Sequence, residues 1–474
     1  MNENKPLVSR ANQSDSLPST GQDDPLIASS KSASRQDGIR DAALQAVAQG
    51  GGENYFSAFA LLLQASPFQI AILSSLPQMI GIVFQLLSVK LLSLFNAKRL
   101  ILVGGMGQAL CWIPLVTLPL LFSDHGAWWL ILCVVLYVAL GSLTVPAWNS
   151  LLIGTVDPNG RGTYFARRLQ MTSLTSFLAL GAAGAVLNVG ERWGFHWSGF
   201  VLIFLGAAIA RALATRCQLA TAQGVTAPIP EAPGGFRHFL LRAATPDLRR
   251  FLLFSSLMHF SVFVAGPFFV LYMLQDLHLS YLQYAGWMAA GILAQFLTLK
   301  PWGQLSDAYG NKAILRLTGF SVPLLPLLYL LSDAYPFLLM VNFFGGATWA
   351  GLSLGLQNYV FDSVRPEERT RGVAVANAVN ATGWFLGAMA GSWLATVIPS
   401  QVQIVGMTFR PASNLPFLFA ISGLLRLLVS LCLLRTFREP RSLCLPSRRH
   451  MVWELPLVKP LLGRFPWRSF RVPQ

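Results

Sequence analysis

Apolar residues fall into twelve blocks along this chain, separated by short polar loops. Each block is about as long as the roughly 20 residues that a helix needs to cross the hydrocarbon core of a bilayer. The first six blocks cover residues 39–64, 68–94, 99–122, 128–153, 165–189 and 197–217. The second six cover residues 250–274, 279–301, 313–332, 336–361, 372–397 and 414–436. We therefore expect an all-α integral membrane protein with twelve transmembrane helices.

The first block differs from the others because polar residues recur in it at intervals of four. These are Asp41, Gln45, Gln49, Glu53 and Ser57. Such spacing keeps the side chains on one face of a helix. An ionisable group at membrane depth normally faces a protein interior or a water-filled cavity. The block is therefore predicted to form one wall of a polar cavity.

Composition and the placement of charge support this interpretation. Only 12% of the residues are charged, about half the usual share of a soluble domain. The net charge of +15 lies in short loops and in the C-terminal tail, which indicates membrane topology and argues against a nucleic-acid partner. Lys and Arg are concentrated in the loops that follow even-numbered blocks. We therefore expect those loops and both termini to be cytoplasmic, in a multi-pass protein of the cell (inner) membrane.

The chain divides into five parts on this pattern. We expect a disordered cytoplasmic tail at 1–37, a six-helix bundle at 38–217, a cytoplasmic linker at 218–249, a second six-helix bundle at 250–437 and a basic cytoplasmic tail at 438–474. The basic-aromatic tail fits either a segment lying on anionic lipid or a disordered tail that reinforces topology.

The two bundles carry related sequences. Ser66, Gln69 and Ala71 open the second block, and Ser280, Gln283 and Ala285 open the eighth, 214 residues later. The Arg-Gly pair at 161–162 recurs at 371–372, 210 residues later. A shared order and a nearly constant offset predict a duplicated unit, and hence two pseudo-symmetric six-helix bundles.

The most specific motif lies between blocks 8 and 9, where Gly303, Asp307, Gly310 and Lys312 are spaced as Gly-Gln-Leu-Ser-Asp-Ala-Tyr-Gly-Asn-Lys. The chain here resembles the major facilitator superfamily, whose signature loop runs Gly-x-Leu-x-Asp-x-x-Gly-x-Arg/Lys. The resemblance covers residues 38–437 and implies two bundles that rock around a central site. In the first half Ser93 stands where the signature has its acid, which places any gating latch mainly in the second half.

The resemblance also implies which residues take part in gating and transport. By pseudo-symmetry Asp307 is expected to meet the start of block 5 near Arg161 and Arg167, with Arg371 at the matching position of block 11. The alternative for this loop is a tight turn without a gating role. Gly50, Gly51 and Gly52 are expected either to interrupt the first helix or to permit close helix packing.

Four residues are candidates for binding substrate or a proton: Glu53, Gln49, Gln45 and His259. In the family, blocks 1 and 7 line the central cavity. A structural ion pair or a hydrogen bond to a neighbouring helix is the alternative for Glu53, and an ordinary interhelical hydrogen bond is the alternative for the others. Arg211 is predicted to extend to the inner interface, whereas Arg426 lies deeper and requires a partner that the sequence does not identify.

We therefore expect a secondary active transporter that moves a small solute by alternating access, coupled to protons or another ion. Two alternatives remain: a drug or metabolite efflux antiporter, and a non-transporting membrane sensor with a transporter-like fold. Block 5 has no proline where proton-driven exporters of the family often carry one. No nucleophile–base motif, P-loop or metal-ligand spacing appears in the sequence, so we expect no enzyme activity and no cofactor. The expected partners are a small-molecule substrate and membrane lipid, and the expected state is a monomer.

Overall fold

A computed structural model describes residues 25–121, 125–155, 161–221, 245–365, 368–398, 402–404, 407–409 and 413–440. The outer parts of both expected tails, most of the linker and the side chain of Arg161 lie outside these residues. Helices dominate the described chain, as expected, and a short antiparallel hairpin joins two of them. This hairpin pairs β1 (Val402–Ile404) with β2 (Met407–Phe409).

The first half contains a helical element for each of its six blocks. The first block is divided between α1 (Pro25–Gly51), the short 3-10 helix η1 (Glu53–Tyr55) and α2 (Phe56–Leu62). The others are α3 (Pro67–Leu94), α4 (Ala97–Leu121), α5 (Gly126–Thr155), α6 (Arg161–Arg192) and α7 (His196–Thr221). Because α1 begins at Pro25, residues 25–37 are helical, which differs from the expected disordered tail.

The second half repeats the arrangement. Its first block forms α9 (Pro246–Phe263), η4 (Gly266–Phe268), α10 (Phe269–Leu271) and the π-helical η5 (Tyr272–Asp276). The next blocks form α11 (Tyr281–Tyr309), α12 (Asn311–Ser321), α13 (Leu324–Leu328), α14 (Tyr335–Ser363), α15 (Arg369–Val397) and α16 (Leu415–Leu433). The opening helices of both bundles are thus broken, α1 at a glycine run and α9 before Pro267.

The repeated Ser-x-x-Gln sequence forms the same structure in both halves. Ser66 and Ser280 cap the starts of α3 and α11 by accepting from the backbone N–H of the glutamine three residues on. The glutamine side chain accepts in return from the backbone N–H of the serine, which completes a capping box. The sequence repeat therefore marks equivalent helix starts.

Within the described residues, nine helices are long and apolar enough to cross a membrane. The other three blocks are the broken first one, the ninth, which is split between α12 and α13, and α11. The last has the length, but Gln283, Gln295 and Lys300 make it more polar. The multi-pass fold is therefore clear, although length and composition alone identify fewer than twelve spans.

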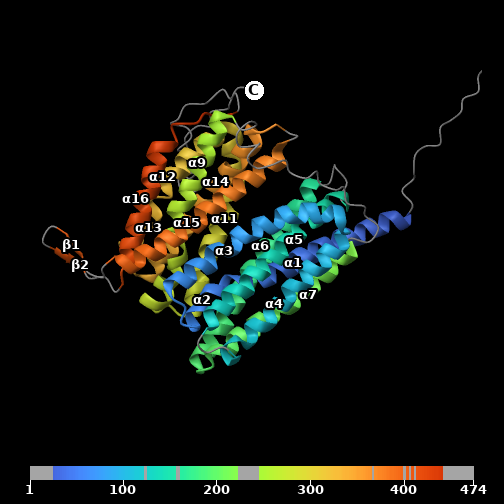
Figure 1. Cartoon of the computed structure of the whole chain (residues 1–474), viewed down its shortest axis with the longest axis horizontal. Coiled ribbons are helices and arrows are strands. Elements are labelled where there is room, and N and C mark those ends of the chain that lie inside the picture. The colour runs from blue at the N-terminus through green and yellow to red at the C-terminus, as the bar shows by residue number, and fades with distance from the viewer. Residues whose placement is uncertain are drawn as a thin grey trace, which may run out of the picture.

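The two halves pack against each other along two helix pairs, α3 with α15 and α6 with α11. Figure 1 shows the first-half helices, blue to green, converging with the yellow-to-red second-half helices near α2 and diverging away from it. The packing of the core follows the same division. One apolar cluster, which we call the shared cluster, contains residues of both halves, among them Tyr55, Ile70, Val264 and Tyr284.

The remaining apolar clusters of the described residues each belong to one half. One lies in the first half around Trp148 and Leu152. Two lie in the second half, around Phe251 and Phe437 and around Trp302 and Ile314. All three are built from the helix ends opposite to the shared cluster. The halves thus share a core at one end of the molecule, here called the closed end, and have separate cores at the other.

Candidate functional site

The break in the first block lies next to Glu53 and depends on close packing of glycines. A Cβ atom at Gly50 would lie 2.2 Å from the backbone oxygen of Ser176, and one at Gly52 would lie 2.5 Å from the Trp112 ring. The helix ends at Gly51, and the Tyr55 N–H donates to the carbonyl of Gly52, 2.9 Å away, to start η1. The glycines therefore allow close helix packing, and the helix is interrupted at the same place.

Glu53 is half-buried at the start of η1 and faces α5. The hydroxyl of Tyr137 donates to Glu53 Oε1 at 2.5 Å. The carbonyl of Tyr137 accepts from Gln108 Nε2 at 2.9 Å, and Gln108 Oε1 accepts from Arg211 Nε at 2.8 Å. Four helical elements thus contribute to one polar chain, which we call the Glu53 network: Glu53, Tyr137, Gln108 and Arg211.

Arg211 corrects one expectation from the sequence. It was predicted to extend to the interface, but it is only 3% exposed inside the first bundle. Its Nη1 has no hydrogen-bond partner among the described residues, and its charge acts on both Glu53 and Asp41. The acceptor at Gln108 and the nearby carboxylates keep the guanidinium in the interior, because a buried cation requires compensation.

A second polar cluster lies further back along α1. Asp41 is fully buried, and its carboxylate accepts from Gln45 Nε2 at 2.6 Å and from Arg168 Nη2 at 3.0 Å. Arg168 Nε also donates to the carbonyl of Gly38. Gln45 is therefore engaged by Asp41, whereas Gln49, between the two clusters, is exposed. The expected polar stripe is present but serves two separate clusters.

His259 lies in the second half and is almost fully buried. Its Nδ1 is 2.7 Å from the carbonyl oxygen of Ser255, and because a carbonyl only accepts, Nδ1 carries the proton. The ring meets Trp384 edge-on, with centroids 5.4 Å apart. Among the described residues, no hydrogen bond or ion pair joins His259 to Glu53.

The signature loop forms the sharp connection between α11 and α12. Gly310 has a positive φ of 83°, a conformation that strongly favours glycine. Asp307 lies in the last turn of α11, and a Cβ added at Gly303 would meet nothing within 4 Å. The backbone N–H of Lys312 donates to Glu439 Oε2 at 2.7 Å, and its ammonium group donates to the carbonyl of Phe437.

The loop is thereby fastened to the chain that follows α16. Arg167 is exposed on α6, and Arg371 is half-buried near the start of α15. The expected contact between Asp307 and the start of block 5 stays a prediction, since the side chain of Arg161 lies outside the described residues.

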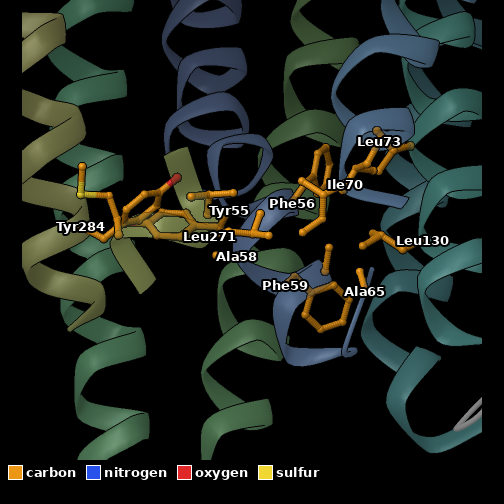
Figure 2. Packing of buried hydrophobic residues seen from close by; sticks show 14 of the residues in the cluster. Tyr55, Phe56, Ala58, Phe59, Ala65, Ile70, Leu73, Leu130, Leu271 and Tyr284 are labelled. Carbon is orange, nitrogen blue, oxygen red and sulfur yellow. The ribbon is translucent and has the colours of Figure 1, made fainter. Parts of the chain in front are cut away.

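The closed end brings the halves together just beyond Glu53. The rings of Tyr55 and Tyr284 meet edge-on with centroids 6.4 Å apart, and those of Phe200 and Tyr281 are 5.7 Å apart. Figure 2 shows Tyr55, Leu271 and Tyr284 side by side where the two halves meet. Gly184 of α6 lies so close to α11 that an added Cβ would be 2.5 Å from the Ala285 Cβ.

Sequence reasoning missed two members of the Glu53 network, Tyr137 and Gln108, and assigned the third, Arg211, to the interface. Gln108 carried a usable signal, because an amide in an otherwise apolar span of α4 requires an interhelical partner. Tyr137 carried none, since tyrosines occur throughout apolar spans. Within the described ranges, no group of three or more His, Cys, Asp or Glu side chains is arranged to hold a metal ion.

Comparisons with known proteins identify the architecture. The family model described as Major Facilitator Superfamily matches residues 251–474. A probable peptide/nitrate transporter of Arabidopsis thaliana is 26% identical over 161 residues, which span 33% of this chain and only 30% of that protein.

Three solved structures share the fold at low sequence identity. The nucleoside transporter NupG is 13% identical with a TM-score of 0.60, covering 85% of this chain and 99% of its own. A bacterial homologue of the iron transporter ferroportin, in an inward-facing state, is 12% identical with a TM-score of 0.66, covering 85% and 98%. An auto-inhibited peptide transporter of the POT family is 15% identical with a TM-score of 0.63, covering 87% and 99%.

Proposed function

We propose that the chain is a transporter of the major facilitator superfamily and that it moves a small solute across the membrane by alternating access, coupled to protons through Glu53. The observation that carries the proposal is the Glu53 network. A carboxylate at membrane depth is costly to keep unless it is paired or functional. Here it lies at a break in the first helix, as binding groups of transporters often do.

The Glu53 network can respond to a proton without unfolding. When Glu53 is ionised, it accepts the Tyr137 hydroxyl and is attracted by Arg211. When it is protonated, the attraction to Arg211 is lost, while the hydroxyl of Tyr137 can still take part in a hydrogen bond. A proton on Glu53 therefore changes the balance of charge inside the first bundle. The exposed Gln49, one turn earlier, is a candidate substrate contact, and His259 is a second titratable group in the opposite bundle.

The packing of the two halves supports alternating access. A shared cluster at one end and separate clusters at the other correspond to one of the two states that such a mechanism requires. With the even-numbered loops cytoplasmic, the closed end faces outward and the molecule is inward-facing. We propose that both termini lie in the cytoplasm and that the protein acts as a monomer in the cell membrane.

Gating in this proposal depends on the second-half signature loop. Asp307 would latch the inner end by meeting the start of α6 near Arg161 and Arg167 when the inner end closes. Lys312 is already held by the segment after α16. The loop would therefore move as a part of the second bundle.

The nature of the solute is open to experiment, since the similar proteins are described as acting on peptides or nitrate, nucleosides and iron. The first experiment is a thermal-shift screen of the purified protein in detergent with dipeptides, nucleosides, nitrate and organic cations. A ligand of the folded state raises the melting temperature according to its concentration relative to its dissociation constant. Efflux of drugs or metabolites is the alternative favoured if lipophilic cations alone give a shift.

The decisive test then uses proteoliposomes that contain the identified solute. Wild type is expected to accumulate solute when a pH gradient is imposed and to exchange labelled for unlabelled solute without a gradient. Glu53→Gln is expected to retain exchange and to lose gradient-driven accumulation. Glu191→Gln, the same change at an exposed position at the end of α6, serves as the control.

Unimpaired accumulation by Glu53→Gln would contradict proton coupling through this residue. Absence of both exchange and accumulation in wild type, for every solute that binds, would favour a sensor over a transporter.

A further inference from the structure

A cavity of about 280 Å³ lies in the second bundle and is lined by residues of that bundle alone. It lies apart from the Glu53 network, whose members all belong to the first bundle. Four of its eleven lining residues are aromatic, and Arg426 is the one cation among them. The residues that matter are Phe269, Trp287, Tyr329, Asn342, Trp349 and Arg426.

Arg426 is the unusual member of this wall. It is 3% exposed, and three of its N–H groups have acceptors: Ser422 Oγ at 3.1 Å and the carbonyl oxygens of Val322 and Val262 at 3.3 and 3.4 Å. Those acceptors are all neutral. Among the described residues no carboxylate forms an ion pair with Arg426. A guanidinium buried at this depth is expensive unless a negative charge compensates it.

The first bundle contains a matching buried arginine, Arg211, whose charge is compensated by neighbouring side chains. Arg211 and Arg426 are 215 residues apart and occupy matching places in α7 and α16. Arg211 has Gln108 as its acceptor and the charge of Glu53 nearby. At the same offset the second half has Pro323 and Phe268. The duplication has kept the cation, and apolar residues stand in place of its acceptor and its counter-charge.

The other walls indicate what kind of anion fits. Trp287 Nε1 donates to the Tyr329 hydroxyl at 3.1 Å, and the Asn342 amide donates to the Trp287 carbonyl, so the indole N–H and one N–H of the amide are already used. The side chains of Phe269, Trp287 and Trp349 present apolar ring surface. A compact, flat apolar body suits such walls, and a guanidinium fork suits a carboxylate.

We propose that this cavity is a binding site for a small organic anion, a carboxylate with a compact aromatic body, for which Arg426 supplies the counter-charge. The site is independent of proton coupling at Glu53. An anion bound there joins α9, α11, α14 and α16, so it stabilises the second bundle as a rigid unit.

The test uses benzoate as the probe, with benzamide as its neutral match and octanoate as a flexible aliphatic carboxylate of the kind that lipids supply. Isothermal titration of the purified full chain in detergent gives affinities, and thermal shift gives an independent reading. Benzoate is expected to bind and to raise the melting temperature, whereas benzamide and octanoate are expected to bind at least tenfold more weakly.

Variants that fill the cavity or remove its cation test whether benzoate binds there. Gly345→Leu fills the cavity, since a Cβ there meets its nearest neighbours, Leu325 and Asn342, at 3.8–3.9 Å. Gly266→Val is a second filling variant, because nothing lies within 4 Å of the added Cβ. Both are expected to lower benzoate affinity more than tenfold, as is Arg426→Gln. Gly206→Leu, at an exposed glycine of α7 with equal room, is the control and should bind as wild type does.

Glu53→Gln separates this site from the proposed transport site, and benzoate binding is expected to survive that change. Absence of benzoate binding in wild type would overturn the proposal. So would binding that persists in both filling variants, or binding that is lost only in Glu53→Gln. Octanoate binding equal to that of benzoate would overturn the aromatic preference and identify a fatty-acid site.

Discussion

At the scale of single residues, charge in the interior of this protein is managed differently in its two halves. In the first half Arg211 has an acceptor at Gln108, which also holds the backbone of Tyr137, the residue that binds Glu53. Gln108 therefore connects a buried cation to a buried carboxylate. In the second half Arg426 has only neutral acceptors among the described residues.

This connection predicts that Gln108→Leu destabilises the protein far more than its size change implies. Leucine fills a similar volume but leaves the Arg211 guanidinium without its acceptor, and a lost hydrogen bond to a charged group costs about 1.5–3 kcal/mol. The measurement is thermal unfolding in detergent. Gln78→Leu makes the same chemical change at an exposed site on α3 and is expected to be nearly neutral. Equal effects of the two changes would contradict the structural role of Gln108.

The candidate site could be predicted from the sequence only in part. The i+4 spacing correctly marked Asp41, Gln45 and Glu53 as one polar stripe of the first helix. Spacing within one helix does not reveal which distant helices supply partners, so Tyr137 and Arg168 were missed. Arg211 was misassigned because its position in the span fits an interfacial arginine, and only the packing of α4 against α7 reveals an internal acceptor.

At the scale of elements, small residues set how closely the helices approach. Gly383, Gly387 and Gly391 follow one another at intervals of four on α15. The first two face the backbone of α9, and Gly391 faces the carbonyl of Val264 directly after it. A Cβ at Gly387 would lie 2.2 Å from the carbonyl oxygen of Phe260. Packing of this kind is typical of membrane helices, where close backbone contact replaces much of the hydrophobic driving force.

The same substitution is therefore expected to have opposite signs at two glycines. Gly387→Ala forces α9 and α15 apart and should destabilise the protein by about 1–3 kcal/mol, as overpacking does. Gly206→Ala adds a methyl group in open space on α7 and should stabilise its helix by roughly 0.5–1 kcal/mol. Thermal unfolding of both variants beside wild type checks the contrast. A neutral or stabilising Gly387→Ala would show that the two helices do not pack as closely as described.

The positions of the helices were largely predictable, since blocks of apolar residues locate helices well. The breaks within the helices were harder to predict. The glycine run left a break near Glu53 as one of two alternatives, and the only signals for the split of the ninth block into α12 and α13 are Pro323 and Pro326. The helical continuation of the first block back to Pro25 was missed because residues 25–37 are polar, and polarity was interpreted as disorder.

At the scale of the whole molecule, the two bundles meet in a shared core at one end only. Gly184 and Ala285 face each other across this end, on α6 and α11. If the bundles rock during transport, these positions must separate in every cycle. A bond between them would hold the closed end shut.

A double variant, Gly184→Cys with Ala285→Cys, is expected to form a disulfide on mild oxidation in a background whose five native cysteines are replaced. The two backbones approach closely enough for a short cross-link with modest adjustment. Transport in proteoliposomes should stop on oxidation and return with a reductant. Each single cysteine variant should be insensitive to both treatments. A cross-linked protein that still transports would refute rocking at this end.

The shared core also has a thermal consequence. It is made of aromatic and aliphatic side chains, and opening the closed end would expose them to the water that fills a transport pathway. Exposure of apolar surface raises heat capacity, and the gain from burying it shrinks on cooling. The balance between the two orientations should therefore shift with temperature, and cold should favour the one that opens the core. If the protein alternates between two states with the proposed orientation, it should spend more of its time outward-facing in the cold than in the warm.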